Sequence, residues 1–307
     1  MPNHPTLKLN EQVQIPTVGF GTYLIANDDA QAAVDAALRA GYRHIDTAET
    51  YENERGVGAA IRAFLQRQGA PRDEVFVTTK LWPGNAAWGH TPKTYASTIE
   101  SLNTSLDHLG LDHVDLYLIH APFHPEQRLE QWRALVELRR QGKARAIGVS
   151  NFSATHIDEL EAAGFPLPDA NQIELHPWSQ KPQLVSYLAD KKIAPIAYSS
   201  LVPLSTWRAA KGHDSAKTDA MKADGQRADS PFKAMAAKYG VSEAQVLLRW
   251  AVHKGYAILP KSTNPERVRQ NIDLWSFTID DDDMRAIEAM DRGDGVAWSV
   301  GDPTKSG

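Results

Sequence analysis

The chain has 307 residues, of which 42% are hydrophobic and 23% are charged, and its formal net charge is −5. This composition is typical of a globular protein, and the negative charge without any Lys/Arg run argues against nucleic acid as a partner. The sequence has no cysteine, which excludes disulfides, thiol catalysis and thiolate metal sites. It begins without a signal segment and has no apolar run of membrane-spanning length, so we expect a cytoplasmic protein.

Short apolar segments that favour strands alternate along the chain with segments of helical periodicity. Residues 6–16, before the first of these strands, have the pattern of a hairpin that turns at Asn10 and Glu11. We expect this hairpin to plug the N-terminal end of the fold. Eight strand candidates follow, at residues 18–21, 44–47, 75–81, 114–120, 146–150, 170–175, 194–199 and 257–262.

The helical segments between these strands carry recognisable start and stop signals. One ends at Gly41, and another is expected to run from Thr91 as N-cap, with Pro92 in its first turn, to Gly110. A third spans residues 153–164. A fourth begins with Ser242 and Gln245 at the spacing of a capping box.

Eight strands that are each followed by helix predict a closed (β/α)8 TIM barrel with an N-terminal β-hairpin, forming one domain over residues 1–307. An open doubly wound sheet is the alternative. Its dinucleotide fingerprint needs a Gly-rich turn after the first strand. Gly56 and Gly58 are the nearest match, but they lie within a helical pattern, where we interpret them as helix-packing residues.

Two segments depart from the repeat. Residues 202–230, after the seventh strand, are long, polar and rich in Ala, Lys, Asp and Gly. In a barrel, a long loop at this end favours a cover over a bound cofactor, with a disordered surface loop as the alternative. The C-terminal tail, residues 292–307, either brings Trp298 over the site or lies on the surface.

Polar side chains stand at the predicted strand ends, where barrels carry their active sites. Asp46 and Tyr51 share one strand end, and the others bring Lys80, His120, Ser150, Asn151, Gln172, Tyr198, Ser199, Lys261 and Ser262. An ammonium next to a phenol favours the phenolate and is expected to lower the pKa of Tyr51. A phenol activated in this way could protonate a carbonyl oxygen while a nicotinamide delivers hydride to the carbon.

The chain resembles the aldo-keto reductases over essentially its whole length. The resemblance is carried by GFGTY (19–23), HIDTAETYENERGVG (44–58), TTKLW (78–82), LDHLGLDHVDLYLIHAP (106–122), GKARAIGVSNF (142–152), NQIELHPW (171–178), IAYSSL (196–201) and LPKSTNPERVRQN (259–271). It implies NADPH-dependent reduction of an aldehyde or ketone, by a monomeric enzyme, through a catalytic tetrad of Asp46, Tyr51, Lys80 and His120.

The resemblance also assigns the cofactor contacts. Ser150, Asn151 and Gln172 would bind the carboxamide, Tyr198 would stack on the nicotinamide ring, and Ser199 and Leu201 would hold the pyrophosphate. The remaining expected cofactor residues are Thr22, Tyr23, Asp46, Thr263, Gln270 and Asn271. Tyr23, Trp82, His120 and Trp88 would line the substrate pocket. Ala121 stands where many relatives have Trp, Ser200 replaces a frequent Pro, and Gln270 replaces a frequent Glu.

The adenine end of the cofactor site is also suggested by the residues themselves. Asn264 is expected to be the N-cap of a helix with Pro265 in its first turn, and a helix N-terminus offers free N–H groups to an anion. Lys261, Ser262 and Arg267 add the charge and hydroxyl that a 2′-phosphate needs, which favours NADPH over NADH.

Two other functions are compatible with a barrel of this kind. A metal-dependent hydrolase would draw ligands from the 11 histidines, such as His44, His120, His124 and His176. No His-x-His pair lies on an early strand, and we expect His44 to point away from the face that Asp46 uses, deeper in the barrel. A non-catalytic NADPH-sensing protein is the second alternative.

Overall fold

In the computed structural model, residues 5–204, 230–293, 295, 298 and 301–306 are described. The N-terminal hairpin is present: β1 (Thr6–Lys8) pairs antiparallel with β2 (Gln14–Pro16). Three of its buried side chains, Leu9, Val13 and Ile15, pack in one cluster with inward-facing residues of the barrel strands. The hairpin therefore plugs the barrel, as expected.

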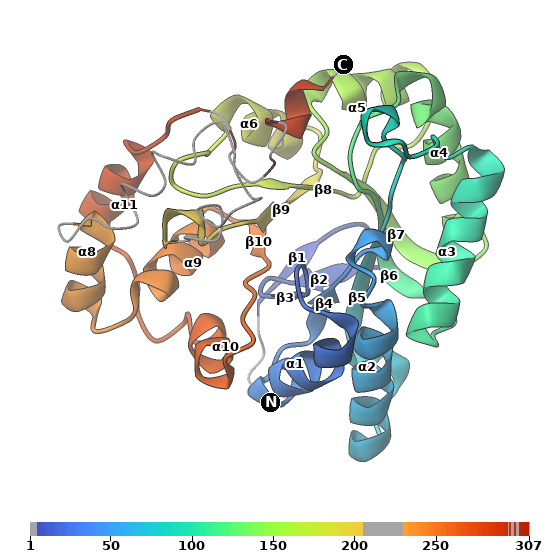
Figure 1. Cartoon of the computed structure of the whole chain (residues 1–307). Helices are drawn as coiled ribbons and strands as arrows, with labels where there is room; N and C mark the ends of the chain where they lie inside the picture. Colours follow the sequence, from blue (N-terminus) through green and yellow to red (C-terminus); the bar gives the residue numbers. More distant parts are fainter. Residues whose placement is uncertain (1–4, 205–229, 294, 296–297, 299–300, 307) are drawn as a thin grey trace.

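The main sheet consists of eight parallel strands, in the order β10-β9-β8-β7-β6-β5-β4-β3 (Figure 1). A parallel bridge between Val18 and Ile258 joins its two edges. The predicted (β/α)8 barrel is confirmed. The strands are β3 (Phe20–Gly21), β4 (His44–Asp46), β5 (Phe76–Leu81), β6 (Val114–Ile119), β7 (Ala144–Ser150), β8 (Ala170–Glu174), β9 (Ala194–Tyr198) and β10 (Ala257–Ile258).

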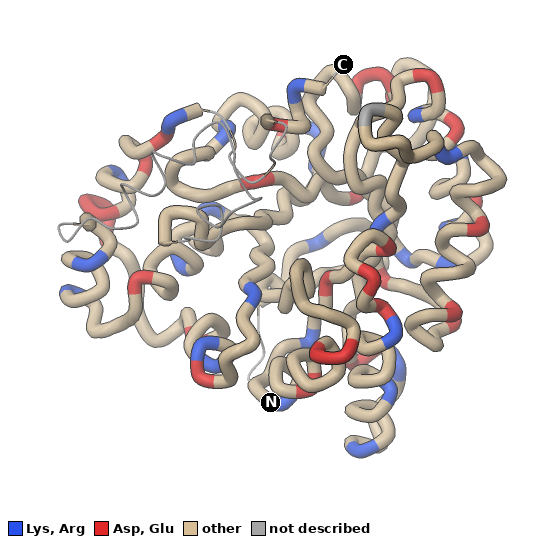
Figure 2. The backbone as a smooth tube through the Cα atoms, in the orientation of Figure 1, with Lys and Arg blue, Asp and Glu red and all other residues tan. Residues whose placement is uncertain are grey.

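The helices lie outside the strands, and Lys/Arg and Asp/Glu are intermixed along them (Figures 1 and 2). In the described part of the chain they are α1 (Asn27–Ala40), α2 (Glu54–Gln68), α3 (Tyr95–Leu109), α4 (Pro125–Arg140), α5 (Ala154–Ala162), α6 (Pro182–Asp190), α8 (Pro231–Tyr239), α9 (Glu243–His253), α10 (Pro265–Ile272) and α11 (Asp281–Glu288). One large apolar core fills the space between the helices and the barrel wall, and a smaller one fills the barrel interior at the hairpin end.

Most predicted helix ends are confirmed. Gly41 ends α1 in the left-handed conformation at φ 108°, and Ser242 with Gln245 forms the capping box of α9. The predicted start of α3 is wrong, because the N-cap is Thr94 and not Thr91. Thr94 forms a capping box with Ser97, in which each side chain accepts the backbone N–H of the other residue.

The two glycines of α2 are packing residues, as interpreted from the sequence. A Cβ on Gly56 would lie 2.4 Å from the Asn27 carbonyl oxygen, and one on Gly58 would lie 2.1 Å from the Leu109 carbonyl oxygen. Only a residue without a side chain allows α1 and α3 to approach α2 this closely. No dinucleotide fingerprint exists at these positions.

Of the expected cofactor-covering loop 202–230, residues 205–229 lie outside the described residues. Its first residues form a short 3-10 helix, η4 (Val202–Leu204). No helix in the described residues is long and apolar enough to cross a membrane.

Candidate active site

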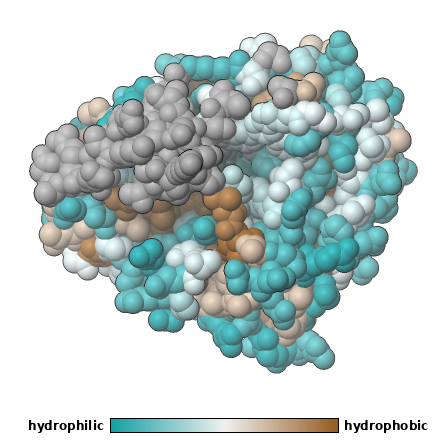
Figure 3. All heavy atoms as spheres, viewed as in Figure 1, coloured by the Kyte–Doolittle hydropathy of each residue, from teal (hydrophilic) through white to brown (hydrophobic). Residues whose placement is uncertain are grey.

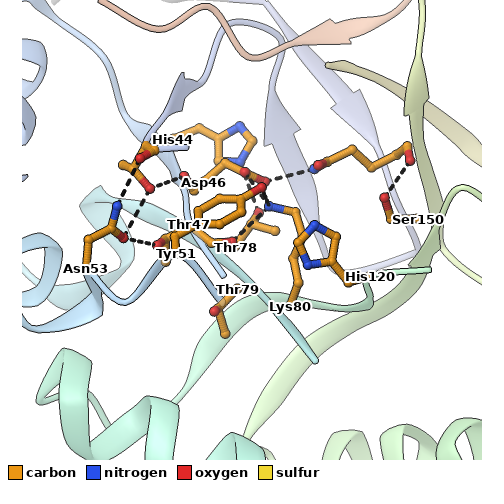
Figure 4. Close-up of polar contacts among 12 residues, drawn as sticks. His44, Asp46, Thr47, Tyr51, Asn53, Thr78, Thr79, Lys80, His120 and Ser150 are labelled. Atoms are coloured by element: carbon orange, nitrogen blue, oxygen red, sulfur yellow. Dashed lines mark hydrogen bonds and ion pairs between the residues drawn. The ribbon is translucent and has the colours of Figure 1, made fainter. Parts of the chain in front are cut away.

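Three neighbouring strand ends bring Asp46, Tyr51, Lys80 and His120 together (Figure 4). Asp46 is the last residue of β4, and Tyr51 ends the short 3-10 helix η1 (Glu49–Tyr51) that follows. Lys80 lies near the end of β5, and His120 comes directly after β6. Because neighbouring strands are parallel, all four side chains meet at one end of the barrel.

Asp46 and Lys80 form a buried ion pair with 2.5 Å between Oδ1 and Nζ. The side chains are 4% and 0% exposed. Lys80 also donates to the Thr47 carbonyl oxygen at 2.8 Å. Burial raises the pKa of the Asp46 carboxyl and lowers the pKa of the Lys80 ammonium, while their mutual attraction opposes both shifts. A short, charge-assisted hydrogen bond of this kind favours the charged forms of both groups.

The Tyr51 hydroxyl lies 3.4 Å from Lys80 Nζ, and the phenol ring lies between those of Tyr23 and His120, with centroids 5.1 and 5.7 Å away. The expected lowering of the phenol pKa is wrong for the free protein. Burial raises the pKa of Tyr51 well above its usual range, and the Asp46 carboxylate adds to the effect. The hydroxyl therefore holds its proton at neutral pH.

His120 faces Tyr51 edge to face, at an interplanar angle of 72°. Its Nδ1 atom is buried and has no hydrogen-bond partner among the described residues. Burial, reinforced by the charge of Lys80, holds the pKa of His120 well below its usual range. The imidazole is therefore neutral at physiological pH, so it can direct an N–H group at a ligand without adding positive charge.

The expected carboxamide-binding residues form a connected network beside the ion pair. Gln172 donates from Nε2 to Asp46 Oδ2 at 2.8 Å, a contact that the sequence did not suggest. Ser150 donates to the Gln172 carbonyl oxygen at 2.8 Å, and Asn151 donates from Nδ2 to the His120 carbonyl oxygen at 3.0 Å. Asn151 has φ 63°, a left-handed conformation uncommon for residues other than glycine. Strand ends β6, β7 and β8 are thus tied together.

The C-terminal tail brings Trp298 to the site, which was one of the two arrangements expected from the sequence. Its Nε1 donates to the Tyr198 hydroxyl at 2.9 Å, and Tyr198 donates in turn to Asn151 Oδ1 at 2.7 Å. The indole lies edge to face with His120, with centroids 6.1 Å apart. Trp298 therefore contacts both the expected nicotinamide side and the expected substrate side.

An aromatic wall borders His120. It consists of Trp82, Trp88, Phe123 and Trp298. The three indoles lie within 13° of parallel, with centroids 5.6 to 6.5 Å apart, and Phe123 meets all three edge to face. Trp88 is 41% exposed, so part of its surface is accessible to a ligand. Figure 3 shows that this view of the surface is hollowed near its centre.

Where the adenine end of the cofactor is expected, Asn264 is the N-cap of α10 and Pro265 its first residue, as predicted. The Asn264 side chain accepts from the backbone N–H groups of Glu266 and Arg267, so these are not free for an anion, contrary to our expectation. The exposed side chains of Lys261 and Arg267 remain to meet a phosphate.

The other expected cofactor residues differ in accessibility. Thr263 and Gln270 are exposed, Ser199 and Leu201 are half-buried, and Asn271 is buried. Thr22 is fully buried, and its hydroxyl donates to the Asp46 carbonyl oxygen at 2.9 Å. Ser199 has φ 56°, and the buried hydroxyl of the adjacent Ser200 has no partner among the described residues. An unsatisfied donor next to the expected pyrophosphate position fits an anionic group there.

Asn53 is a site residue that the sequence did not reveal. Its Nδ2 donates to the carbonyl oxygens of Thr22 and Ile25, both at 2.9 Å, and its Oδ1 accepts from the Thr47 hydroxyl at 2.7 Å. Since it is completely buried, Asn53 fixes the loops before α1 and after β4 against each other. Phe123, which belongs to the aromatic wall, is a second site residue that the sequence did not reveal.

The expected direction of His44 is wrong. Residues two apart in a strand share a face, so His44 points into the barrel on the same side as Asp46, one layer deeper (Figure 4). There its Nε2 lies 3.0 Å from the Thr78 hydroxyl. No group of three or more His, Asp or Glu side chains in the described residues could hold a metal ion.

The fold and this site define a barrel oxidoreductase of the kind that takes a nicotinamide cofactor, and comparisons with known proteins agree. The sequence model of the Aldo/keto reductase family matches residues 17–292. The NAD(P)H-dependent D-xylose reductase I,II of Candida tropicalis is 36% identical, covering 95% of this chain and 94% of its own length. Methylglyoxal reductase DkgA of Escherichia coli is 34% identical, with coverages of 95% and 96%.

A solved structure gives the same result. The Bombyx mori aldo-keto reductase in complex with NADP has a TM-score of 0.82 and 36% identity, over 95% of this chain and 94% of its own. The chain belongs to the aldo-keto reductase family. It is an oxidoreductase of this family, and the similar Bombyx mori structure holds NADP.

Proposed function

We propose that this enzyme reduces an aldehyde or ketone to the alcohol, reversibly, with the Tyr51 hydroxyl as general acid. The supporting observation is the Tyr51 hydroxyl 3.4 Å from the buried Lys80 amine, with its ring edge to face with His120. Burial raises the pKa of Tyr51 and lowers the pKa of His120, which favours a protonated phenol and a neutral imidazole. Bound NADPH supplies the hydride to the carbonyl carbon. Tyr51 donates its proton as negative charge develops on the carbonyl oxygen, and Lys80 stabilises the phenolate that remains.

His120 and Asp46 have supporting roles in this proposal. His120 donates an N–H group to the carbonyl oxygen and so orients the substrate toward Tyr51. Asp46, fixed by Gln172, holds the Lys80 ammonium in place through their ion pair. The Lys80 ammonium largely cancels the negative charge of Asp46. The phenolate that forms on Tyr51 is therefore not repelled by an unpaired carboxylate.

Cofactor binding is proposed along the line of strand ends. Ser150, Asn151 and Gln172 take the carboxamide, Tyr198 packs on the ring, and backbone groups of Ser199 and Leu201 meet the pyrophosphate. The adenosine end would lie against Lys261, Ser262, Thr263, Arg267, Gln270 and Asn271, with Thr22 and Tyr23 near the nicotinamide. The Ser262 hydroxyl accepts from the Asn264 N–H at 3.1 Å, which leaves its own hydrogen to donate to a phosphate.

The substrate is proposed to be a medium-sized, mainly apolar carbonyl compound. Tyr23 packs against Tyr51, and Trp82 packs against His120. The aromatic wall extends from Trp82 and has no carboxylate or ammonium among its members. Burying apolar surface against such rings is favourable, whereas a polyhydroxylated substrate would leave its hydroxyls without partners there.

The test is turnover of NADPH with a panel that contains aryl and alkyl aldehydes, ketones, D-xylose and methylglyoxal. Tyr51→Phe should lower kcat by a factor on the order of 10² to 10⁴, the range for loss of a positioned proton donor. NADPH binding, followed by protein fluorescence, should be nearly unchanged. Tyr187→Phe, on α6, is the matched control and should keep the full rate. Near-normal reduction by Tyr51→Phe would contradict the mechanism and leave His120 as the donor to test.

A further inference from the structure

Glu49 connects the segment that carries the phenol to the segment that carries the ammonium. It is the first residue of η1, which ends at Tyr51. Its carboxylate reaches across to β5 and accepts the backbone N–H of Trp82 at 2.8 Å. Trp82 comes two residues after Lys80. The two segments are also linked at the start of the turn, where the Thr47 N–H donates to the Thr78 carbonyl oxygen at 2.9 Å. The Glu49 hydrogen bond adds a second link, beyond Lys80 on one segment and close to Tyr51 on the other.

The far end of this hydrogen bond is firmly held. Trp82 is followed by Pro83, whose carbonyl oxygen accepts from the Lys93 N–H at 2.9 Å and from Gln131 Nε2 at 3.2 Å. Gln131 is buried in α4 and also donates to the Lys93 carbonyl oxygen at 2.9 Å. Glu49 therefore binds the first residue of the loop after β5, a position that these hydrogen bonds hold in place.

A cation holds the carboxylate in place. Lys93 Nζ lies 3.8 Å from Glu49 Oε1 and is itself fixed by donating to the Ser101 hydroxyl at 2.7 Å. The Glu49 side chain is 20% exposed. This carboxylate is separate from the tetrad: its described contacts are with Trp82, Lys93 and Ser101, and none is with Tyr51, Lys80 or His120.

Tyr51 depends on such a support. Its hydroxyl is 3.4 Å from Lys80 Nζ, near the longest distance at which a hydrogen bond forms, so a small outward movement would break the contact. The helix η1 has only three residues, and Tyr51 is only half-buried. Asn53 and Thr47 anchor one side of this turn, and Glu49 anchors the other.

We propose that Glu49 is a positioning residue for the reduction reaction, which sets the distance between the Tyr51 hydroxyl and Lys80 through the Trp82 N–H without touching the substrate. This inference rests on the proposed role of Tyr51 as proton donor. It requires a hydrogen-bond acceptor at position 49 and not a base, because the carboxylate only accepts an N–H.

The test compares Glu49→Ala with Glu49→Gln, and uses Glu52→Ala as the matched control. Glu52 is exposed on the same turn, and its φ of 53° is equally uncommon for Glu and Ala. Glu49→Ala should lower kcat by roughly 10- to 100-fold, as expected for a reacting group displaced by about 1 Å. KM and the Kd for NADPH should change less than about threefold. Glu49→Gln should recover most of the rate, because its amide oxygen accepts the same N–H.

The double variant Glu49→Ala/Tyr51→Phe separates this inference from the proposed function. If Glu49 acts through Tyr51, removing it from Tyr51→Phe should lower the residual rate little further. The same fold loss in both backgrounds, or equal rates for Glu49→Ala and Glu52→Ala, would overturn the inference and leave Tyr51 as donor. A Tyr51→Phe variant with full activity would instead overturn the proposed function itself. Circular dichroism of each variant checks that the barrel is folded.

Discussion

The buried ion pair makes a quantitative prediction about stability. Lys80 and Asp46 are 0% and 4% exposed and lie 2.5 Å apart. At an effective dielectric constant of about 20, their attraction is about 7 kcal/mol before desolvation is counted. Lys80→Met leaves Asp46 buried with Gln172 as its remaining side-chain donor. Breaking one side of such a pair costs about 3 to 5 kcal/mol, a large part of the stability of a typical protein.

The neutral double variant Asp46→Asn/Lys80→Met should recover much of this loss, since no uncompensated charge stays buried. We therefore expect strong non-additivity, with a coupling energy of about 2 to 4 kcal/mol. Urea unfolding followed by circular dichroism, on the wild type, both single variants and the double variant, measures it. Losses that add within about 0.5 kcal/mol would refute the reasoning, because independent sites add to that accuracy.

The pH dependence of Lys80→Met provides a second check on the same pair. Burial raises the pKa of Asp46, and Lys80 opposes this shift in the wild type. Without Lys80, the pKa of Asp46 should rise further, because its main opposing influence is gone. A carboxyl whose folded-state pKa is raised stabilises the protein below its unfolded pKa of about 4 and loses this contribution as the pH rises. The deficit of Lys80→Met relative to wild type should therefore grow between acidic and neutral pH.

Two further predictions concern positions away from the reacting groups. Arg267→Ala should weaken NADPH binding by roughly 10- to 100-fold and NADH binding much less, because it removes a charge-assisted hydrogen bond to the 2′-phosphate. Fluorescence titrations of both cofactors measure the two losses, with Arg269→Ala as the control. Equal losses for NADPH and NADH would leave stacking on adenine as the role of Arg267. Burial lowers the pKa of His44 to about 3, so unfolding should become easier as the pH falls from about 6.5 toward 3, by up to about 4 to 5 kcal/mol. His44→Asn should flatten this acid dependence in urea titrations, and an unchanged slope would show that other groups dominate.

The strands and the meeting of Asp46, Tyr51, Lys80 and His120 could be predicted because their signals are local. Strands of a parallel barrel are buried on both faces and appear as short apolar runs, such as residues 114–120. Each tetrad residue stands within a few positions of the end of such a run. Once the eight runs imply a barrel, their ends meet in space, so the cluster follows without knowledge of any contact.

The supporting residues could not be found in this way. Asn53 binds Thr22, 31 residues earlier, and Glu49 binds Trp82, 33 residues later. Neither pairing has a period or a short-range motif, and both side chains have ordinary alternatives as a helix cap and a surface carboxylate. The misplaced N-cap of α3 has a similar cause, since Thr91 and Thr94 are both acceptable caps. The choice between them depends on Ser97 and on the contact of Lys93 with Pro83.

The direction of the Tyr51 pKa shift illustrates a further limit. Lys80 near Tyr51 suggested a lowered pKa for the phenol. The sequence does not show, however, that Lys80 forms its closest contact with Asp46. Lys80 lies 2.5 Å from Asp46 and 3.4 Å from Tyr51, so the phenol faces a nearly neutral pair and burial decides the direction. This arrangement suits a proton donor. In the mechanism that we propose, the hydroxyl stays protonated until hydride transfer, and Lys80 gains its influence only when negative charge develops on the phenol oxygen.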